Sequence, residues 1–127
     1  MPDRDAVATA RRQAEKRGHL AEALAAWMLR LKGYRILARR HRTRLGEIDL
    51  VVKKGDVIAF VEVKARSDDN AAIDSVSLTA QHRIRAAGDL WIARQAGRGA
   101  DLSRFSYRYD IVAIRPGRWP RHFPDAF

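Results

Sequence analysis

The sequence contains no cysteine and no long apolar run. The first absence excludes disulfide bonds, thiol catalysis and cysteine-ligated metals. The second argues against a membrane-spanning helix, and the polar start, Met1-Pro2-Asp3-Arg4-Asp5, does not resemble a secretory signal peptide. We therefore expect a soluble, cytoplasmic protein with no membrane partner. Its 127 residues, 46% of them hydrophobic, are expected to form a single domain over residues 1–127.

Acidic residues are scarce relative to basic ones, 15 against 25, so the net charge is +10 and the isoelectric point is near 11.0. Such an excess favours a polyanionic partner, and nucleic acid, most simply DNA, fits best. Most of the basic residues are arginine, which binds phosphate in a bidentate manner. The alternative is a positively charged surface that serves solubility alone. An anionic membrane surface is disfavoured, because no basic amphipathic anchor stands out.

The densest alternation of apolar and polar residues lies at positions 45–64, where two strands flank a turn at Gly55. The alternation puts seven apolar residues on one face: Ile48, Leu50, Val52, Val57, Ala59, Val61 and Val63. If Gly55 and Asp56 form a two-residue loop, Asp49 sits directly opposite Glu62.

The opposite face of this hairpin combines apolar and charged side chains. Its members are Glu47, Asp49, Val51 and Lys53 on the first strand and Ile58, Phe60, Glu62 and Lys64 on the second. Because the half nearest the turn is apolar, we expect this face to be covered. Two carboxylates brought together under cover repel, and a hard divalent ion relieves that repulsion. Oxygen ligands without cysteine or a nearby histidine favour Mg²⁺ or Mn²⁺.

Lys64 lies on the same face as the two acids and allows two interpretations. Its ammonium group can polarise a water molecule or stabilise charge on a phosphate. It can equally form an ordinary cross-strand ion pair with Asp49 or Glu62, worth a few tenths of a kcal/mol. Glu47 belongs to the same face and is a possible auxiliary group.

An Asp, a short hairpin and then Glu-x-Lys resemble the core motif of the PD-(D/E)xK nuclease superfamily, with Asp49, Glu62 and Lys64 in the matching places. More specifically, residues 46–50 followed by residues 60–66 resemble the YraN-type family of small bacterial nuclease-like proteins. The similarity extends from about Gly18 to the C-terminal residues 125–127.

This resemblance implies a restriction-endonuclease-like fold and a set of site residues. Asp49, Glu62 and the Val63 carbonyl would bind Mg²⁺ or Mn²⁺, and Lys64 would orient water or stabilise charge. Glu22 would correspond to an accessory acid on the first helix, in a motif where Ala21 replaces the usual glycine. Gln81 would hydrogen-bond a water molecule or a phosphate, although Ala80 stands where the family usually has lysine.

Residues from about Asp5 to Lys32 are rich in helix-forming types and predict one long helix, which Gly18 could divide. We expect its inward face to be a stripe of large apolar residues, namely Leu20, Leu24, Trp27, Met28 and Leu31. Glu22 lies roughly opposite that stripe, beside Ala25, Ala26 and Leu29. On the pattern alone it is either an ordinary exposed glutamate or a partly buried acid.

A strand is predicted to begin at Tyr34, after Gly33 ends the helix. It leads into the densest positive run of the chain, residues 39–44, which directly precedes the acidic hairpin. The arginines of this run are predicted to bind a nucleic-acid backbone: Arg39, Arg40, Arg42 and Arg44. A solubilising loop is the alternative. The resembled family tends to have asparagine where this chain has Arg40.

The second half of the chain predicts a loop, a helix and a strand. Residues 65–77 are polar and are expected to form a mobile loop. Residues 79–96 predict a helix that starts at Thr79 and packs through Ile84, Ala87, Trp91 and Ile92. Gln81 could be an ordinary surface residue, and His82 is expected at the surface.

Residues 105–114 predict a final strand, parallel to its neighbour because a helical crossover precedes it. Arg108-Tyr109-Asp110 resembles a family element that we interpret as structural, with Asp110 accepting backbone or arginine contacts. The aromatic tail, with Trp119, Phe123 and Phe127, is expected to pack back on the sheet.

These elements predict an α/β fold with a mixed sheet flanked by helices, in the order αβββαβ. Together with the resemblance, they predict a metal-dependent endonuclease-like protein that acts on nucleic acid, most simply DNA. A non-catalytic nucleic-acid-binding module that retains the nuclease fold is the alternative.

Overall fold

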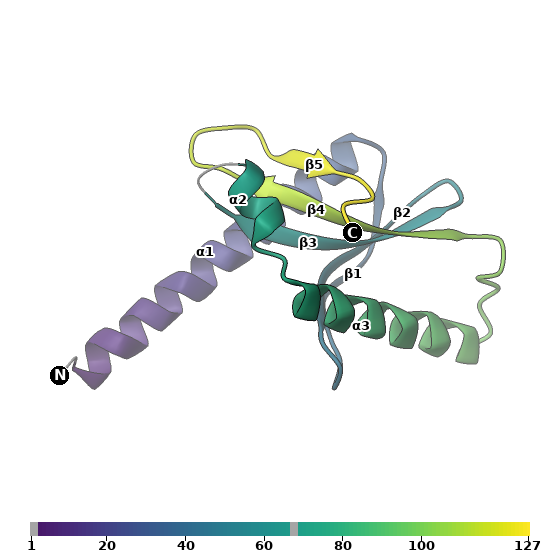
Figure 1. Cartoon of the computed structure of the whole chain (residues 1–127), viewed down its shortest axis with the longest axis horizontal. Helices are drawn as coiled ribbons and strands as arrows, with labels where there is room; N and C mark the ends of the chain where they lie inside the picture. The colour runs from purple at the N-terminus through teal and green to yellow at the C-terminus, as the bar shows by residue number, and fades with distance from the viewer. Residues whose placement is uncertain (1–2, 67–68) are drawn as a thin grey trace.

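The computed structural model describes residues 3–66 and 69–127. In chain order the elements are α1 (Arg4–Leu31), β1 (Arg35–Arg42), β2 (Glu47–Lys54), β3 (Val57–Ala65), α2 (Asp69–Asp74), α3 (Leu78–Gly97), β4 (Ser106–Ile114) and β5 (Arg121–Phe123). The strands form one sheet in the order β1-β2-β3-β4-β5. Only the β3–β4 pairing is parallel among the strand pairs described. The mixed α/β fold and its αβββαβ core are therefore confirmed, with α2 and β5 as additions (Figure 1).

The β2–β3 hairpin has the predicted two-residue loop, since Lys54 pairs with Val57. Gly55 occupies the left-handed region at φ 58°, which glycine adopts at little steric cost. The ladder ends at Leu50 and Val61, so the two strands are no longer paired at Asp49. The Asp49 carboxylate there accepts a hydrogen bond from the Val63 backbone N–H at 2.7 Å.

Two apolar layers cover the faces of the sheet. The first layer packs against α1. It contains Leu50 and Val52 of β2 together with Ala59 and Val61 of β3. Against α3 lies the opposite set, with Val51, Ile58 and Phe60 packed on Ala87 and Trp91. Val51, Ile58 and Phe60 are thus covered, as predicted. The prediction that Asp49 and Glu62 share their face is wrong, because the two acids line a cleft against α1. Ile48 is an exception, because it packs in the α3 layer and not with Leu50.

Helix α1 runs without a break through Gly18, but its inward face differs from the prediction. The buried residues are Ala21, Ala25, Ala26, Met28 and Leu29. Of the predicted stripe, Met28 is buried as expected. The other four residues, Leu20, Leu24, Trp27 and Leu31, lie on the outside and are between 51% and 64% exposed. Small alanines allow the helix to approach the sheet closely, so the larger side chains are left on the solvent side.

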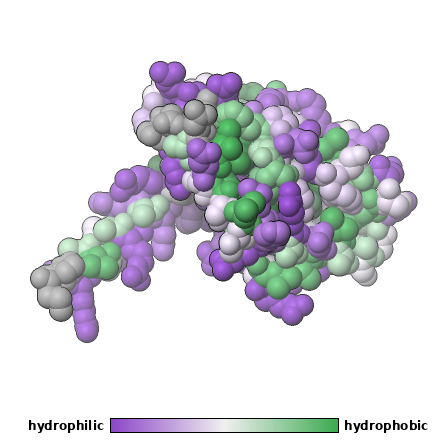
Figure 2. Space-filling view, in the orientation of Figure 1, coloured by the Kyte–Doolittle hydropathy of each residue, from purple (hydrophilic) through white to green (hydrophobic). Residues whose placement is uncertain are grey.

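The N-terminal half of α1 extends away from the sheet (Figure 1), and residues 3–20 are all exposed. Figure 2 shows hydrophilic side chains alternating with apolar ones along this projecting segment. Among the residues that the structure describes, no helix has the length and apolarity needed to cross a membrane.

Three other boundaries differ from the prediction. Strand β1 continues through Arg42, so most of the arginine run is strand and not loop. Within the predicted loop at 65–77, residues 69–74 form α2, while Ser67 and Asp68 lie outside the described residues. Helix α3 is capped by Ser77, whose hydroxyl accepts from the Ala80 N–H, and not by Thr79.

A buried ionic cluster centred on Asp110 ties the end of the chain to the sheet. Asp110 is fully buried and accepts two hydrogen bonds of 2.8 Å from Arg108. His122 contacts the same carboxylate at 2.7 Å, and the Asp125 N–H donates to it at 2.9 Å. Burial alone would raise the pKa of Asp110, but the bonds from His122 and Arg108 outweigh it and lower the pKa. The structural role predicted for Asp110 is confirmed.

Two further contacts extend this cluster to the first half of the chain. Arg108 also donates to the Tyr34 hydroxyl at 2.8 Å, and Lys32 lies 2.6 Å from the other ring nitrogen of His122. In the tail, Phe123 and Phe127 pack on the sheet as predicted, whereas Trp119 is 63% exposed.

We expect Asp110→Asn to lower the free energy of unfolding by about 3 kcal/mol, because it leaves the buried partners of one carboxylate uncompensated. Urea unfolding followed by circular dichroism measures the change. Asp74→Asn, at an exposed position on α2, is the matched control and should stay within about 0.5 kcal/mol of the parent. Equal losses of unfolding free energy in the two variants would show that the Asp110 cluster contributes no more to stability than an exposed acid does.

Candidate functional site

A cleft of about 580 Å³ lies between α1 and the ends of β2 and β3. Its lining contains the acids and the lysine that the sequence singled out, together with small residues and two arginines of the surrounding elements: Ala14, Arg17, Gly18, Ala21, Glu22, Asp49, Glu62, Val63, Lys64, Ala65 and Arg66. The structure therefore brings together Asp49, Glu62, Val63, Lys64 and Glu22.

Asp49 and Glu62 form a close acid pair. Their side chains are near enough to share a hydrogen bond, which requires that one of the two carboxyl groups carry a proton. Burial, followed by the charge of Glu62, raises the pKa of Asp49 to about 8, even though the Val63 N–H opposes the shift. Burial also raises the pKa of Glu62, against the opposing effect of Lys64. With its pKa raised to about 8, Asp49 is expected to hold a proton at neutral pH in the metal-free protein.

Lys64 lies beside the acid pair, with its ammonium nitrogen 3.2 Å from a Glu62 carboxylate oxygen. Both side chains are mostly buried, with 24% of Lys64 and 14% of Glu62 exposed. Lys64 therefore forms the ion pair that was one of its two predicted roles, with Glu62 as its partner. This ion pair leaves the chemical interpretation open, because the same ammonium group lines the cleft and is within reach of an anion placed there.

Glu22 occupies the cleft from the α1 side and pairs with Arg40 of β1. Its charge contributes to the raised pKa of Asp49. Arg40 has φ 47°, a left-handed conformation in which asparagine is among the better-tolerated residues. Its Nε pairs with Glu22, and the contact of Arg40 with a nucleic-acid backbone stays a prediction.

The other arginines of the predicted phosphate-binding run lie on or beside β1. Arg42 is 3.5 Å from Glu47 in an exposed ion pair, and Arg39 and Arg44 are exposed. Sequence reasoning missed Arg17 and Arg66, which line the acid cleft itself. Arg66 lies two residues after Lys64 and could have been found from that spacing, whereas Arg17 could not, since it depends on how α1 crosses the sheet.

Gln81 is not part of the cleft lining. Its amide nitrogen donates to the Val76 carbonyl at 3.2 Å, at the start of α3. Its proposed contact with water or phosphate therefore stays a prediction. His82 is exposed, as expected.

The chemistry of the donor set suits a hard divalent cation. Asp49 and Glu62 present oxygen ligands that already need a positive compensating charge, and the Val63 carbonyl is adjacent in the chain. Glu22 already forms an ion pair with Arg40, so it is not available as a third metal ligand beside Asp49 and Glu62. Consistently, the described residues include no group of three or more His, Cys, Asp or Glu side chains arranged to hold a metal. The two carboxylates are the type of ligand that a magnesium-type ion prefers, and the Val63 carbonyl as a further ligand stays a prediction.

Comparison with known proteins finds a match to the family described as "Uncharacterised protein family UPF0102" over residues 21–114. A UPF0102 protein of Rhizobium leguminosarum bv. trifolii is 63% identical over 127 residues, covering all of both chains. One of Rhizobium meliloti is 59% identical over 94% of each chain. One of Agrobacterium fabrum is 57% identical over 97% of this chain and 98% of its own. The names of these relatives state a family and no activity.

The raised pKa of Asp49 predicts a pH-dependent stability in the metal-free protein. In the unfolded chain Asp49 releases its proton near its ordinary pKa of 3.8, whereas the folded protein retains it up to about pH 8. The folded state therefore binds more protons across this range, and its stability falls as the pH rises.

We expect the free energy of unfolding of the parent, relative to Asp49→Asn, to decrease steadily from about pH 5 to pH 9. Chemical denaturation in EDTA at fixed ionic strength measures both proteins, and the difference removes the titration of histidines elsewhere. Parallel pH profiles for the two proteins would contradict a protonated acid pair.

Proposed function

We propose that this chain, which belongs to the uncharacterised protein family UPF0102, is a metal-dependent endonuclease-like protein that hydrolyses phosphodiester bonds in nucleic acid, most simply DNA. Its membership of UPF0102 bears out the resemblance to the YraN-type family. The observation that carries the proposal is the acid pair of Asp49 and Glu62 with Lys64 beside it, in a cleft rimmed by arginine.

Asp49 and Glu62 have the oxygen ligands for Mg²⁺ or Mn²⁺, and the Val63 carbonyl would complete the protein's share. When bound, such an ion lowers the pKa of water and offsets negative charge on a phosphate. The Val63 N–H fixes the Asp49 carboxylate, so this ligand is oriented in advance.

The remaining residues bind and position the substrate. Lys64 is placed to stabilise charge on the scissile phosphate or to orient the attacking water. Arg17 and Arg66 supply cations at the cleft, where a phosphodiester backbone would enter. Glu22 and Arg40 act as a positioning pair that holds α1 over the acids, and Gln81 stays a second-line candidate.

A non-catalytic nucleic-acid-binding module is the second candidate. Two observations favour it: Glu62 already pairs with Lys64, and Glu22 already pairs with Arg40. A site neutralised in this way is stable without a metal, and the net charge of +10 would still bind nucleic acid. Metal binding and cleavage separate the two candidates.

We expect Mg²⁺ or Mn²⁺ to raise the melting temperature, by about 4 °C at ten times the dissociation constant, because the ion binds the folded acid pair alone. Differential scanning fluorimetry against metal concentration measures the shift. Asp49→Asn and Glu62→Gln should remove it, and Asp74→Asn should preserve it. An unchanged metal response in both site variants would place the metal elsewhere.

We expect the parent to cleave at least one of single-stranded, duplex or branched DNA with Mg²⁺ or Mn²⁺, and Lys64→Ala to lose cleavage by at least about 100-fold. Lys64 acts on the reacting phosphate, so the metal-dependent melting shift and overall DNA affinity should change little. Gel assays under single-turnover conditions measure the rate.

Lys16→Ala is the matched control for this variant, because it removes one lysine from an exposed position of α1 outside the cleft lining. It should cleave at the parental rate. If the parent cleaves no substrate of the panel while still binding DNA, the non-catalytic candidate is correct.

A further inference from the structure

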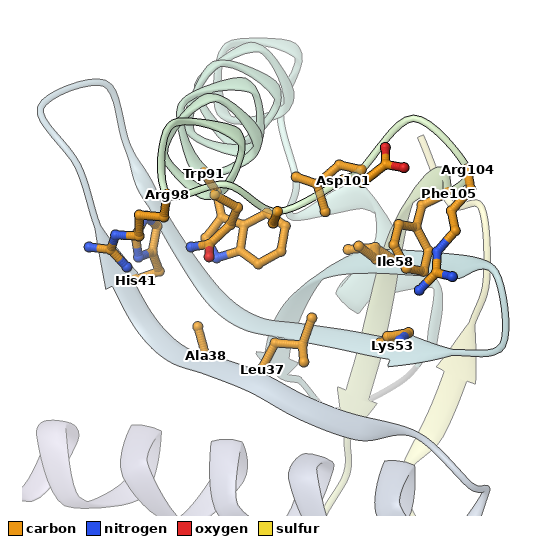
Figure 3. A pocket seen from close by; sticks show the side chains of 13 residues that line it. Leu37, Ala38, His41, Lys53, Ile58, Trp91, Arg98, Asp101, Arg104 and Phe105 are labelled. Carbon is orange, nitrogen blue, oxygen red and sulfur yellow. The ribbon is translucent and has the colours of Figure 1, made fainter.

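A second cavity, of about 630 Å³, lies on the α3 side of the sheet and shares no lining residue with the acid cleft. It is formed between the C-terminal half of α3, the loop that follows it and strands β1 to β3 (Figure 3). Its volume falls in the range of small-molecule sites.

The walls of this cavity are apolar at the centre. Leu37 and Ala38 of β1 lie below, facing Trp91 of α3, and Ile58 of β3 lies deeper between the layers (Figure 3). Leu37 is 38% exposed, so the apolar wall is accessible from solvent. Trp91 is 5% exposed and belongs to the core layer with Phe60, so it forms the inner wall of a slot, opposite Leu37.

Positive side chains stand at both ends of the slot. Arg98 lies at one end, beside the imidazole ring of His41, and Lys53 and Arg104 lie at the other (Figure 3). Lys53 and Arg104 are each held 4.9 Å from the centre of the Phe105 ring, which fixes their position without neutralising them. Asp101 is the acid among the described lining residues, and its carboxylate accepts from Ser103. The cavity therefore has an excess of positive charge.

His41 adds an unsatisfied polar atom. Its Nε2 is buried and finds no hydrogen-bond partner among the described residues. Burial, together with the charges of Arg94 and Arg98, lowers the pKa of His41. A buried nitrogen without a partner costs free energy, and an anionic or hydrogen-bonding ligand in the cavity would recover it.

We propose that this cavity binds one unpaired nucleotide of a single-stranded nucleic acid, with the base between Leu37 and Trp91 and its flanking phosphates at the two cationic ends. A nucleotide combines a flat base with negative charge on either side, which is the pattern that the cavity presents. Single-strand binders commonly use this combination of an apolar or aromatic platform and a cationic track. The site is separate from the acid cleft and needs none of its residues.

Trp91 provides a direct test, because it lines the cavity and the chain's other tryptophans, Trp27 and Trp119, are 60% and 63% exposed. We would place Trp27→Phe and Trp119→Phe in the full chain, which leaves Trp91 as the sole tryptophan, excited selectively over the tyrosines. Decathymidylate, thymidine monophosphate and inorganic phosphate are then titrated in EDTA. We expect saturable quenching by the oligonucleotide and by the nucleotide, and none by phosphate alone.

In the same background, Arg98→Ala with Arg104→Ala should weaken oligonucleotide binding by at least about tenfold, since two phosphate contacts are lost. Arg11→Ala with Arg12→Ala is the matched control, because both arginines are exposed on the projecting part of α1. It should change affinity by less than about twofold. His41→Phe keeps an aromatic ring but removes both ring nitrogens, and it should also weaken binding.

Absence of quenching by the oligonucleotide, equal responses to phosphate and nucleotide, or equal losses in the two arginine pairs would each overturn this site. The titration contains no metal and involves no cleavage. If the protein proves not to hydrolyse nucleic acid, the fluorescence titration still tests this cavity. If the titration shows no binding, the proposal for the acid cleft still stands.

Discussion

The two-residue loop at Gly55 and Asp56 is the constraint on which the arrangement of the acid cleft depends. It fixes the register of β2 against β3, and because side chains alternate with a period of two, a slip of one residue would move every side chain to the other face. The register brings Asp49 and Glu62 close together where the regular pairing of β2 with β3 ends. The repulsion between these acids is thus a consequence of backbone geometry, offset by a proton and by Lys64.

The parts of the structure that depend on local rules could be predicted. The hairpin register follows from turn chemistry, and the parallel β3–β4 pairing follows from the helical crossover between them. The placement of Lys64 beside Glu62 follows from their spacing on one strand. The role of Asp110 came from a resemblance and agrees with the buried cluster.

The parts that depend on how α1 crosses the sheet could not be predicted. A stripe of large apolar residues and a stripe of alanines both satisfy helical periodicity, and the choice between them depends on how closely helix and sheet approach. Ala21 and Ala25 face the sheet, so Leu24 and Trp27 are exposed. The same orientation of α1 places Glu22 in the cleft with Asp49 and Glu62. The contributions of Arg17 to the cleft and of Arg40 to Glu22 were missed for the same reason. The second cavity was missed because its walls come from β1, β2, β3, α3 and a loop.

The Asp110 cluster also bears on the order in which the fold can be completed during synthesis. Its members come from position 32 to position 125, so the network joins residues made early to residues made about 90 positions later. Helix α1 and the β1–β2–β3 meander can form from nearby segments as they leave the ribosome, whereas β4 introduces a buried carboxylate before His122 and the Asp125 N–H exist to satisfy it. A nascent chain stopped before residue 122 therefore holds Asp110 with Arg108 as its partner in the cluster. The pairing of β5 with β4 brings His122 to Asp110 and completes the hydrogen bonding of this buried carboxylate.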